Sequence, residues 1–270
     1  MKLDLIDAFT TSLPFSGNPA AVIQSSQPLS DDLMQQIAAQ HNLSETAFIT
    51  PIEDMPEHYY IRWFTPTTEV DLCGHATLAA AYAVFVDHQV RQVTFHTKKH
   101  GSLPVVLRNE GLCMDFPVQP QRRVETAPLT LVNAIPQGFS EVFFGTDWLV
   151  VYDDPELVLT AEPDFSSLAR LPGRGVILTA PGIGEYDFIS RFFAPRVGIN
   201  EDPATGSAHC ALGPYWCVRL ERQRVTGWQA SKRGGALTVD VGHGRVSLMG
   251  RCRLYSSSWI HQDTLDHLGL

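Results

Sequence analysis

The sequence has few charged residues and no segment in which basic residues collect. Only 18% of its 270 residues are Asp, Glu, Lys or Arg, and the formal net charge is −9. Such a surface does not attract nucleic acid or an anionic membrane, so we expect neither as a partner. A small anionic substrate is not excluded, because local dipoles rather than net charge would hold it.

Cysteine is also scarce, and its spacing forms no disulfide or zinc motif. The five cysteines include no Cys-x-x-Cys pair, and their number is odd. The ten histidines do not pair with thiols or carboxylates at metal-ligand spacing, and the adjacent His209 and Cys210 cannot easily share one ion. We therefore expect reduced thiols and no metal.

Long apolar runs are absent. No stretch approaches the roughly 20 apolar residues of a membrane span. Asp4 and Asp7 stand where a signal peptide needs apolar residues. We expect a cytosolic protein.

The clearest local pattern lies between Arg62 and Val86. Pro66 ends a strand, and Ala76 to Val86 has no polar face, which predicts a buried helix. Backbone N–H groups at the start of such a helix need partners and favour negative charge. Gly74, at this start, lets a ligand approach the bare backbone, so the stretch is a candidate anion site.

The same pattern recurs later in the chain. Arg191 to Pro195 repeats Arg62 to Pro66 at an offset of 129 residues (191 − 62), and Gly206 aligns with Gly74 at an offset of 132 (206 − 74). This ordered repeat indicates a duplication, with each half pointing one helix start at a shared cleft.

At about 150 residues per domain, 270 residues correspond to 1.8 domains (270/150), which agrees with two halves. We place them at residues 1–122 and 123–270, joined through a proline-containing linker at 117–128. Residues 244–254 are expected to form one strand, and the tail from Tyr255 is expected to be partly loose.

Glu45 is the most informative residue outside the helix starts. At a period of two it shares a strand face with Leu43, Ala47 and Ile49. An acidic group on an apolar face is costly unless it is paired or partly protonated, which is how a carboxyl group becomes a general acid/base. The alternatives are a solvent-exposed glutamate or one buried against Arg62.

The other candidates each have a structural alternative. His75 either shuttles a proton or caps its helix, and Cys73 is either reactive or a small buried hydrophobe. Asp202 and Ser207, taken singly, are turn or cap residues, but with Gly206 between them they gain weight as a site. Asn18 stands in Gly-Asn-Pro, where asparagine usually serves only to form a turn.

These residues lie in four motifs that resemble the phenazine-biosynthesis (PhzF-like) family. The motifs are Gly17-Asn18-Pro19-Ala20, Leu43-Ser44-Glu45-Thr46, Cys73-Gly74-His75-Ala76 and Asp202-Pro203-Ala204-Thr205-Gly206-Ser207. The resemblance covers nearly the whole chain. It implies the α+β fold of diaminopimelate epimerase, in which each of two similar halves wraps a β-sheet around a central helix.

The resemblance also implies a chemistry, namely cofactor-free isomerisation in which Glu45 moves a proton. His75, Asp202 and Ser207 would complete the polar site, and a homodimer is plausible. Asn18, Cys73, Gly74, Thr205 and Gly206 are then expected to contact a small anionic substrate.

Two alternatives stay open. Related epimerases and racemases place one cysteine before each helix-start glycine, and Cys73 fits that pattern whereas Thr205 does not, because a hydroxyl cannot serve as the second thiolate. An epimerase or racemase would then use Cys73 with a non-thiol partner. A duplicated scaffold that binds a metabolite or a protein without turnover is the other alternative.

Overall fold

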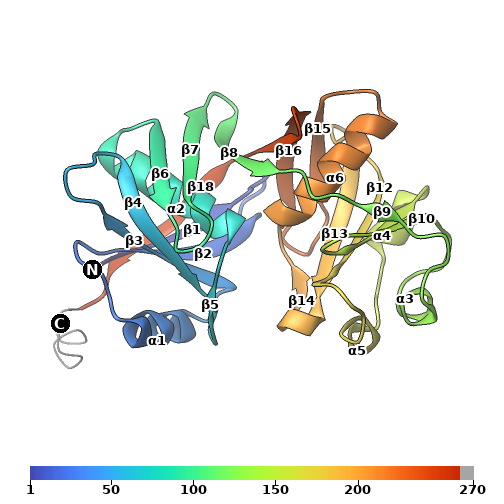
Figure 1. Ribbon diagram of the computed structural model, residues 1–270, viewed down its shortest axis with the longest axis horizontal. Coiled ribbons are helices and arrows are strands. Elements are labelled where there is room, and N and C mark those ends of the chain that lie inside the picture. Colours follow the sequence, from blue (N-terminus) through green and yellow to red (C-terminus); the bar gives the residue numbers. More distant parts are fainter. Residues whose placement is uncertain (262–270) are drawn as a thin grey trace. The chain divides into compact units, whose positions relative to one another are not determined.

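A computed structural model describes residues 1–261, and this part of the chain divides into two compact units. Unit 1 comprises residues 1–10, 18–115 and the described chain from 249 onward, whereas unit 2 comprises residues 11–17 and 116–248. In each unit, strands surround one long helix, α2 in unit 1 and α6 in unit 2 (Figure 1). Each unit is thus of the α+β class.

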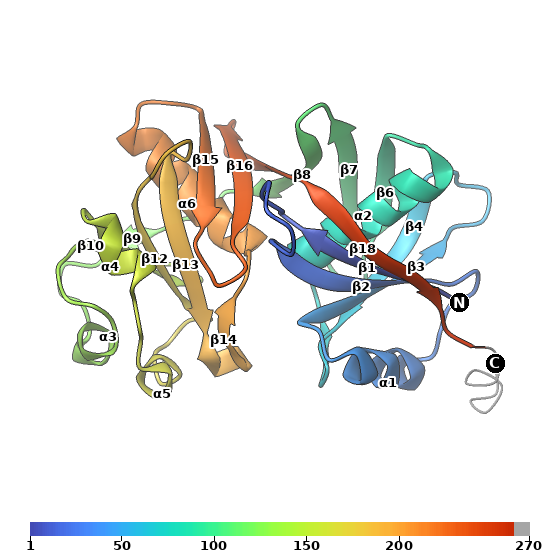
Figure 2. The same cartoon turned by 180° about the vertical axis from the view of Figure 1, so that it is seen from behind.

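Unit 1 builds its sheet from both ends of the chain. β1 pairs antiparallel with β2, β2 parallel with β3, β3 antiparallel with β4, and β4 parallel with β6. The late strand β18 lies along the outer edge of β1 (Figure 2). The elements are β1 Lys2–Ala8, β2 Asn18–Gln24, α1 Asp31–His41, β3 Glu45–Pro51, β4 His58–Phe64, β5 Glu69–Val70, α2 Gly74–His88, β6 Gln92–His96, β7 Ser102–Arg108, β8 Gly111–Pro117 and β18 Cys252–Trp259.

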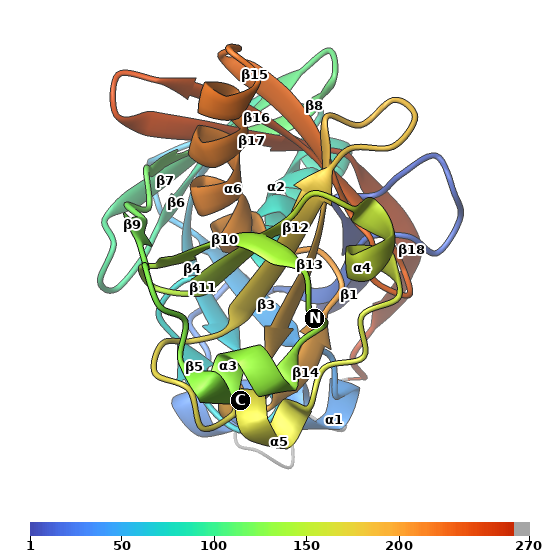
Figure 3. The ribbon, with the colours of Figure 1, turned by 90° about the vertical axis from the view of Figure 1, so that its right-hand side faces the viewer.

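Unit 2 repeats this topology. β10 pairs antiparallel with β11, β11 parallel with β12, β12 antiparallel with β13, and β13 parallel with β15. The short helices α3 and α5 lie side by side (Figure 3). The elements are β9 Arg122–Arg123, α3 Leu129–Ala134, β10 Phe139–Phe144, β11 Trp148–Tyr152, α4 Pro155–Leu159, α5 Phe165–Leu168, β12 Val176–Pro181, β13 Phe188–Ala194, the 3₁₀ turn Pro195–Val197, β14 Ile199–Asp202, α6 Gly206–Arg219, β15 Arg224–Gln229, β16 Gly235–Gly242 and β17 Arg245–Gly250.

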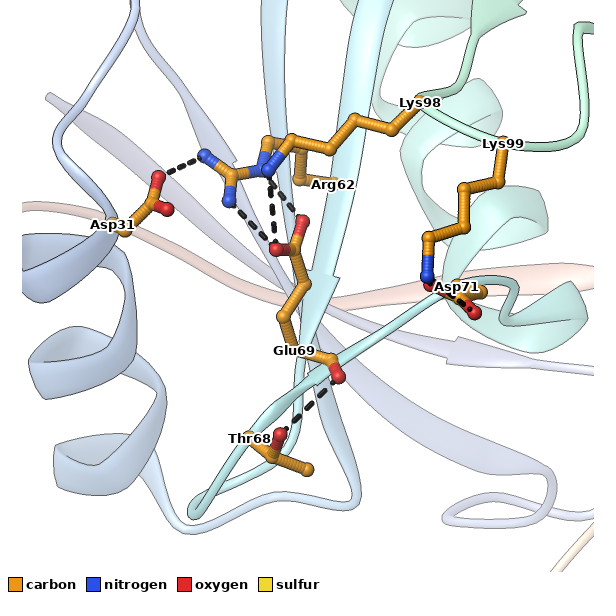
Figure 4. A network of polar contacts seen from close by, with 7 residues as sticks. All are labelled: Asp31, Arg62, Thr68, Glu69, Asp71, Lys98 and Lys99. Carbon is orange, nitrogen blue, oxygen red and sulfur yellow. Dashed lines mark hydrogen bonds and ion pairs between the residues drawn. The ribbon is translucent and has the colours of Figure 1, made fainter.

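An arginine–glutamate clamp recurs at equivalent positions of the two units. Arg62 Nε and Nη2 donate to the carboxylate of Glu69 at 2.7 and 2.8 Å, and Asp31 and Lys98 extend this network (Figure 4). In unit 2, Arg191 makes the same two bonds to Glu201 at 2.7 and 3.0 Å. Each clamp ties its strand to the short strand that leads into the long helix. The repeated arginine therefore holds in place the short strand that precedes each long helix.

The long helices are buried because their sequences offer no polar stripe. Ten residues of α2 and nine of α6 are buried. Pro214 lies inside α6 and cannot donate to the carbonyl of Cys210 one turn earlier. The backbone N–H of Gln119 donates to that carbonyl instead, at 3.2 Å. A buried helix thereby tolerates an internal proline.

Two expectations for the C-terminal region are wrong. Residues 244–254 do not form one strand, because β17 ends at Gly250 and β18 starts at Cys252. The tail from Tyr255 is not loose as far as Trp259, since β18 continues to that residue on the edge of β1. Local polarity at Ser256 to Ser258 hid this pairing, which joins residues more than 250 positions apart. The rest of the expected loose tail, residues 262–270, lies outside the described chain.

Gly213 of α6 provides a test of how closely α6 packs on β16. A Cβ atom at this position would lie 2.3 Å from Cγ1 of Val239. We expect Gly213→Ala to lower the free energy of unfolding by about 1–3 kcal/mol, because the added methyl group overpacks the contact. Urea denaturation would measure this loss. Gly242→Ala is the control, since its Cβ would meet no atom within 4 Å; equal stability of the two variants would contradict the close contact.

Candidate active site

Four side chains of unit 1 gather at the start of α2. Glu45 is the first residue of β3, Asn18 is the first residue of β2, Cys73 is the N-cap of α2 and His75 stands in its first turn. β2 and β3 run parallel and adjacent, so their first residues lie at the same edge of the sheet. The fold thus brings together residues that are up to 57 positions apart in the chain (75 − 18).

His75 is the centre of this cluster. Its Nε2 lies 3.3 Å from Oε2 of Glu45. Its Nδ1 lies 3.3 Å from Nδ2 of Asn18 and 3.5 Å from Sγ of Cys73. The ring therefore connects a carboxyl group on one side to an amide and a thiol on the other.

The surroundings of His75 determine its charge and which ring nitrogen carries the proton. Burial lowers the pKa of the ring to about 4, so it is neutral at pH 7. The amide nitrogen of Asn18 is a donor only, so the Nδ1 that faces it acts as acceptor and the proton is on Nε2. A neutral imidazole that carries its proton on Nε2 therefore lies within 3.3 Å of the carboxyl group of Glu45.

The structure decides between the alternative interpretations of Glu45 and of His75. Glu45 is neither freely exposed nor paired with Arg62, because its side chain is 13% exposed beside His75 whereas Arg62 binds Glu69. His75 does not cap its helix; the N-cap is Cys73, which makes no side-chain capping bond. Glu45 and His75 thus lie side by side at the start of α2.

The start of α2 is open at Gly74. A Cβ atom built there would meet nothing within 4 Å. The first turn of α2 carries no acidic residue and receives no side-chain cap. These features give an anion direct access to backbone N–H groups at the positive end of a buried helix.

A second polar cluster lies at the start of α6 in unit 2. The hydroxyl of Thr205 donates to a carboxylate oxygen of Asp202, and the Thr205 N–H donates to Oε1 of Gln229 at 2.8 Å. The amide of Gln229 in turn donates to the backbone carbonyl of Asp202 at 2.7 Å. Asp202, Thr205 and Gln229 are all buried. The turn that precedes Gly206 is thus held by a closed set of hydrogen bonds.

Ser207, in the first turn of α6, is bound from a different direction. Its hydroxyl accepts a hydrogen bond from Nη1 of Arg174 at 2.8 Å, and Nε of Arg174 donates to the buried Asp147 at 3.0 Å. The guanidinium thus places a positive charge beside the helix start.

Sequence reasoning missed Gln229, Arg174 and Asp147. Each is distant in sequence from the motif that it supports, and no local spacing connects them. The arginine that precedes the apolar strand β12 and the aspartate in the turn before β11 were the only available signals.

Comparison with known proteins gives the family. The model of the family described as phenazine biosynthesis-like protein matches residues 6–256. The chain belongs to the phenazine biosynthesis-like family. An uncharacterized isomerase from Pseudomonas aeruginosa is 47% identical over 264 residues, which cover 96% of this chain and 98% of that protein.

Solved structures agree with this assignment. A PhzF-family protein from Enterococcus faecalis matches with a TM-score of 0.89 and 40% identity, over 96% of this chain and 99% of its own. A hydroxyproline epimerase from Agrobacterium vitis matches with a TM-score of 0.56 and 11% identity, over 96% and 91% of the two chains, which shows a shared fold only. The expected epimerase-like α+β fold is confirmed, and this member of the family is an isomerase. Within residues 1–261, no helix is long and apolar enough to cross a membrane.

Proposed function

We propose that this isomerase moves a proton on a small carboxylate-bearing substrate without a cofactor, and that Glu45 carries the proton. The observation that supports this most is the carboxyl group of Glu45, 13% exposed and 3.3 Å from the ring of a neutral buried histidine. A partly desolvated carboxyl group can both accept a proton and return it, as a general acid/base must.

The reaction balances as an internal proton shift. The carboxylate of Glu45 takes a proton from a substrate carbon, and the electron pair of that C–H bond moves into the adjacent unsaturated system. The carboxylic acid of Glu45 then gives the proton to another carbon of the same molecule. No electron is gained or lost, so the step needs no redox partner.

The open start of α2 supports the binding part of the proposal. Developing enolate charge, or the substrate carboxylate, would accept hydrogen bonds from the backbone N–H groups at Gly74. Gly206 is proposed to do the same at the start of α6. Both sites use preorganised backbone dipoles, which need no metal ion.

The remaining polar residues are proposed to orient the substrate. His75 would hold the carboxyl group of Glu45 through its Nε2–H, while Asn18 fixes the ring. Asp202 and Ser207, which are held by Thr205 and Arg174, would bind polar groups of a substrate at the start of α6. Substrate positioning of this kind contributes to catalysis by removing orientational freedom before the reaction.

Solvent hydrogen exchange tests this function. A panel of small unsaturated carboxylates and amino acids is incubated with the protein in D2O and followed by proton NMR. We expect deuterium to enter one or more carbon positions of at least one substrate, because the proton on Glu45 can exchange with solvent before it returns. A substrate that isomerises only by a route that needs an added metal or nucleotide would contradict the proposal.

A second candidate is an epimerase that uses Cys73. It is favoured by one observation, the 3.5 Å approach of the thiol to Nδ1 of His75, an arrangement that can activate a cysteine. Exchange at a stereogenic α-carbon that is lost in Cys73→Ala but retained in Glu45→Gln would support this candidate. The reverse result would support Glu45.

A further inference from the structure

The cluster at the start of α2 contains three metal-ligating groups of different chemistry. One donor atom each from Glu45, Cys73 and His75 lies within 4.8 Å of the others. Cys73 and His75 are buried, with 7% and 6% of their surfaces exposed. The sequence predicts no metal because its cysteines and histidines show no metal-ligand spacing, and only the fold brings Glu45 close to Cys73 and His75.

The distances suit a tetrahedral zinc ion. Zn–S and Zn–N bonds of about 2.3 and 2.0–2.1 Å place a thiolate and an imidazole nitrogen about 3.5 Å apart in a tetrahedral site. Sγ of Cys73 and Nδ1 of His75 lie 3.5 Å apart. This pair therefore already has the separation of two ligands of one ion.

Glu45 offers the third ligand atom of the cluster. Its carboxylate faces Nε2 of His75, whereas the thiol faces Nδ1, and one ion takes only one ring nitrogen. A tetrahedral site requires separations of about 3.3–3.5 Å, so donors that lie within 4.8 Å need to approach by up to about 1.5 Å (4.8 − 3.3).

Access and composition also favour a cation with affinity for sulfur. A Cβ atom at the neighbouring Gly74 would meet nothing within 4 Å, so there is open space beside the cluster. The equivalent position in unit 2 has Thr205 in place of Cys73 and Ser207 in place of His75, so the same arrangement there lacks both the thiol and the imidazole. A thiolate together with an imidazole selects zinc over magnesium or calcium.

We propose that unit 1 holds an inhibitory site for Zn²⁺, formed by the thiolate of Cys73, the imidazole of His75 and the carboxylate of Glu45. Coordination releases the thiol proton to solvent and leaves one position of the ion for water. The inhibition rests on the proposed function, because a carboxylate bound to zinc cannot take a proton from carbon. Metal binding by the three residues does not depend on it.

Cobalt binding tests the site directly. Co²⁺ is titrated into metal-free protein, and the thiolate-to-cobalt charge-transfer absorption is recorded. We expect one Co²⁺ per chain with this absorption, its displacement by Zn²⁺, and loss of the absorption in Cys73→Ser. Cys113→Ser is the matched control, since Cys113 is a buried cysteine of unit 1 outside the cluster, and it should keep the absorption.

Calorimetric titration with Zn²⁺ adds a quantitative result. We expect Cys73→Ser to weaken Zn²⁺ binding at least about 100-fold, and Glu45→Gln to weaken it at least about 10-fold, because each removes an ionised ligand. No charge-transfer absorption in the wild-type protein, or its retention in Cys73→Ser, would overturn the site.

The inhibitory role is measured separately on the exchange reaction. Addition of Zn²⁺ should abolish deuterium incorporation by the wild-type protein, and a chelator should restore it. Zinc binding without inhibition would overturn the regulatory part alone. Absence of exchange in the metal-free protein would count against the proposed function, while the cobalt spectrum would still decide the site.

Discussion

Glu45→Gln is expected to lower turnover by about 10²–10⁴-fold while the protein remains folded. The amide has almost the same size and keeps the position at the start of β3, but it cannot accept a proton from carbon. Substrate affinity should change little, since the proposed anion binding comes from backbone N–H groups. Steady-state kinetics and solvent deuterium exchange on the substrate found by NMR would measure the effect.

The control for this variant is Glu53→Gln, which makes the same chemical change at an exposed position between β3 and β4. Its activity should equal that of the wild type. Circular dichroism of both variants should be unchanged. Full turnover by Glu45→Gln would show that Glu45 does not carry the proton.

Acid is expected to destabilise this protein well above the pH at which carboxylates titrate. Burial lowers the pKa of His75 to about 4, and that of His209 to about 4 as well. In the unfolded chain both rings have a pKa near 6.5. Between pH 6.5 and 4 the unfolded state therefore binds protons that the folded state does not, so stability falls as the pH falls.

The size of this effect follows from the number of protons. Each histidine contributes up to about 1.4 kcal/mol per pH unit in this window, so the two together contribute roughly 2–3 kcal/mol per unit. Urea denaturation at pH 7, 6, 5.5 and 5 would measure the slope. The dependence should disappear above about pH 7, where neither state binds these protons.

His209→Asn separates one histidine from the other titrating groups. Nδ1 of His209 donates to the carbonyl of Thr205 at 2.8 Å, and the asparagine amide can replace this donor. The slope of stability against pH should then fall by about 1.4 kcal/mol per unit relative to the wild type. Equal slopes would mean that His209 is charged in the folded protein.

The sequence by itself determined the repeated architecture and the main elements. The Arg62 and Arg191 motifs, with their change of offset from 129 to 132 residues, correspond in the structure to two equivalent arginine–glutamate clamps. Helix α1 starts directly after Ser30, a residue type that favours the N-cap, and the Ser30 hydroxyl accepts from the N–H of Leu33. Such features can be predicted because hydrophobic periodicity and helix capping depend on residues that are close together in the sequence.

Only the tertiary structure decided which side chains meet. Periodicity placed Glu45 on an apolar strand face but left its partner open, and the parallel pairing of β2 with β3 brings it to His75 rather than Arg62. The bonds of Arg174 to Asp147 and Ser207, and of Gln229 to Thr205, join elements with no common sequence pattern. β18 likewise forms from a polar tail because β1 offers an open edge. These contacts depend on where the chain returns after long connections, which neither composition nor spacing encodes.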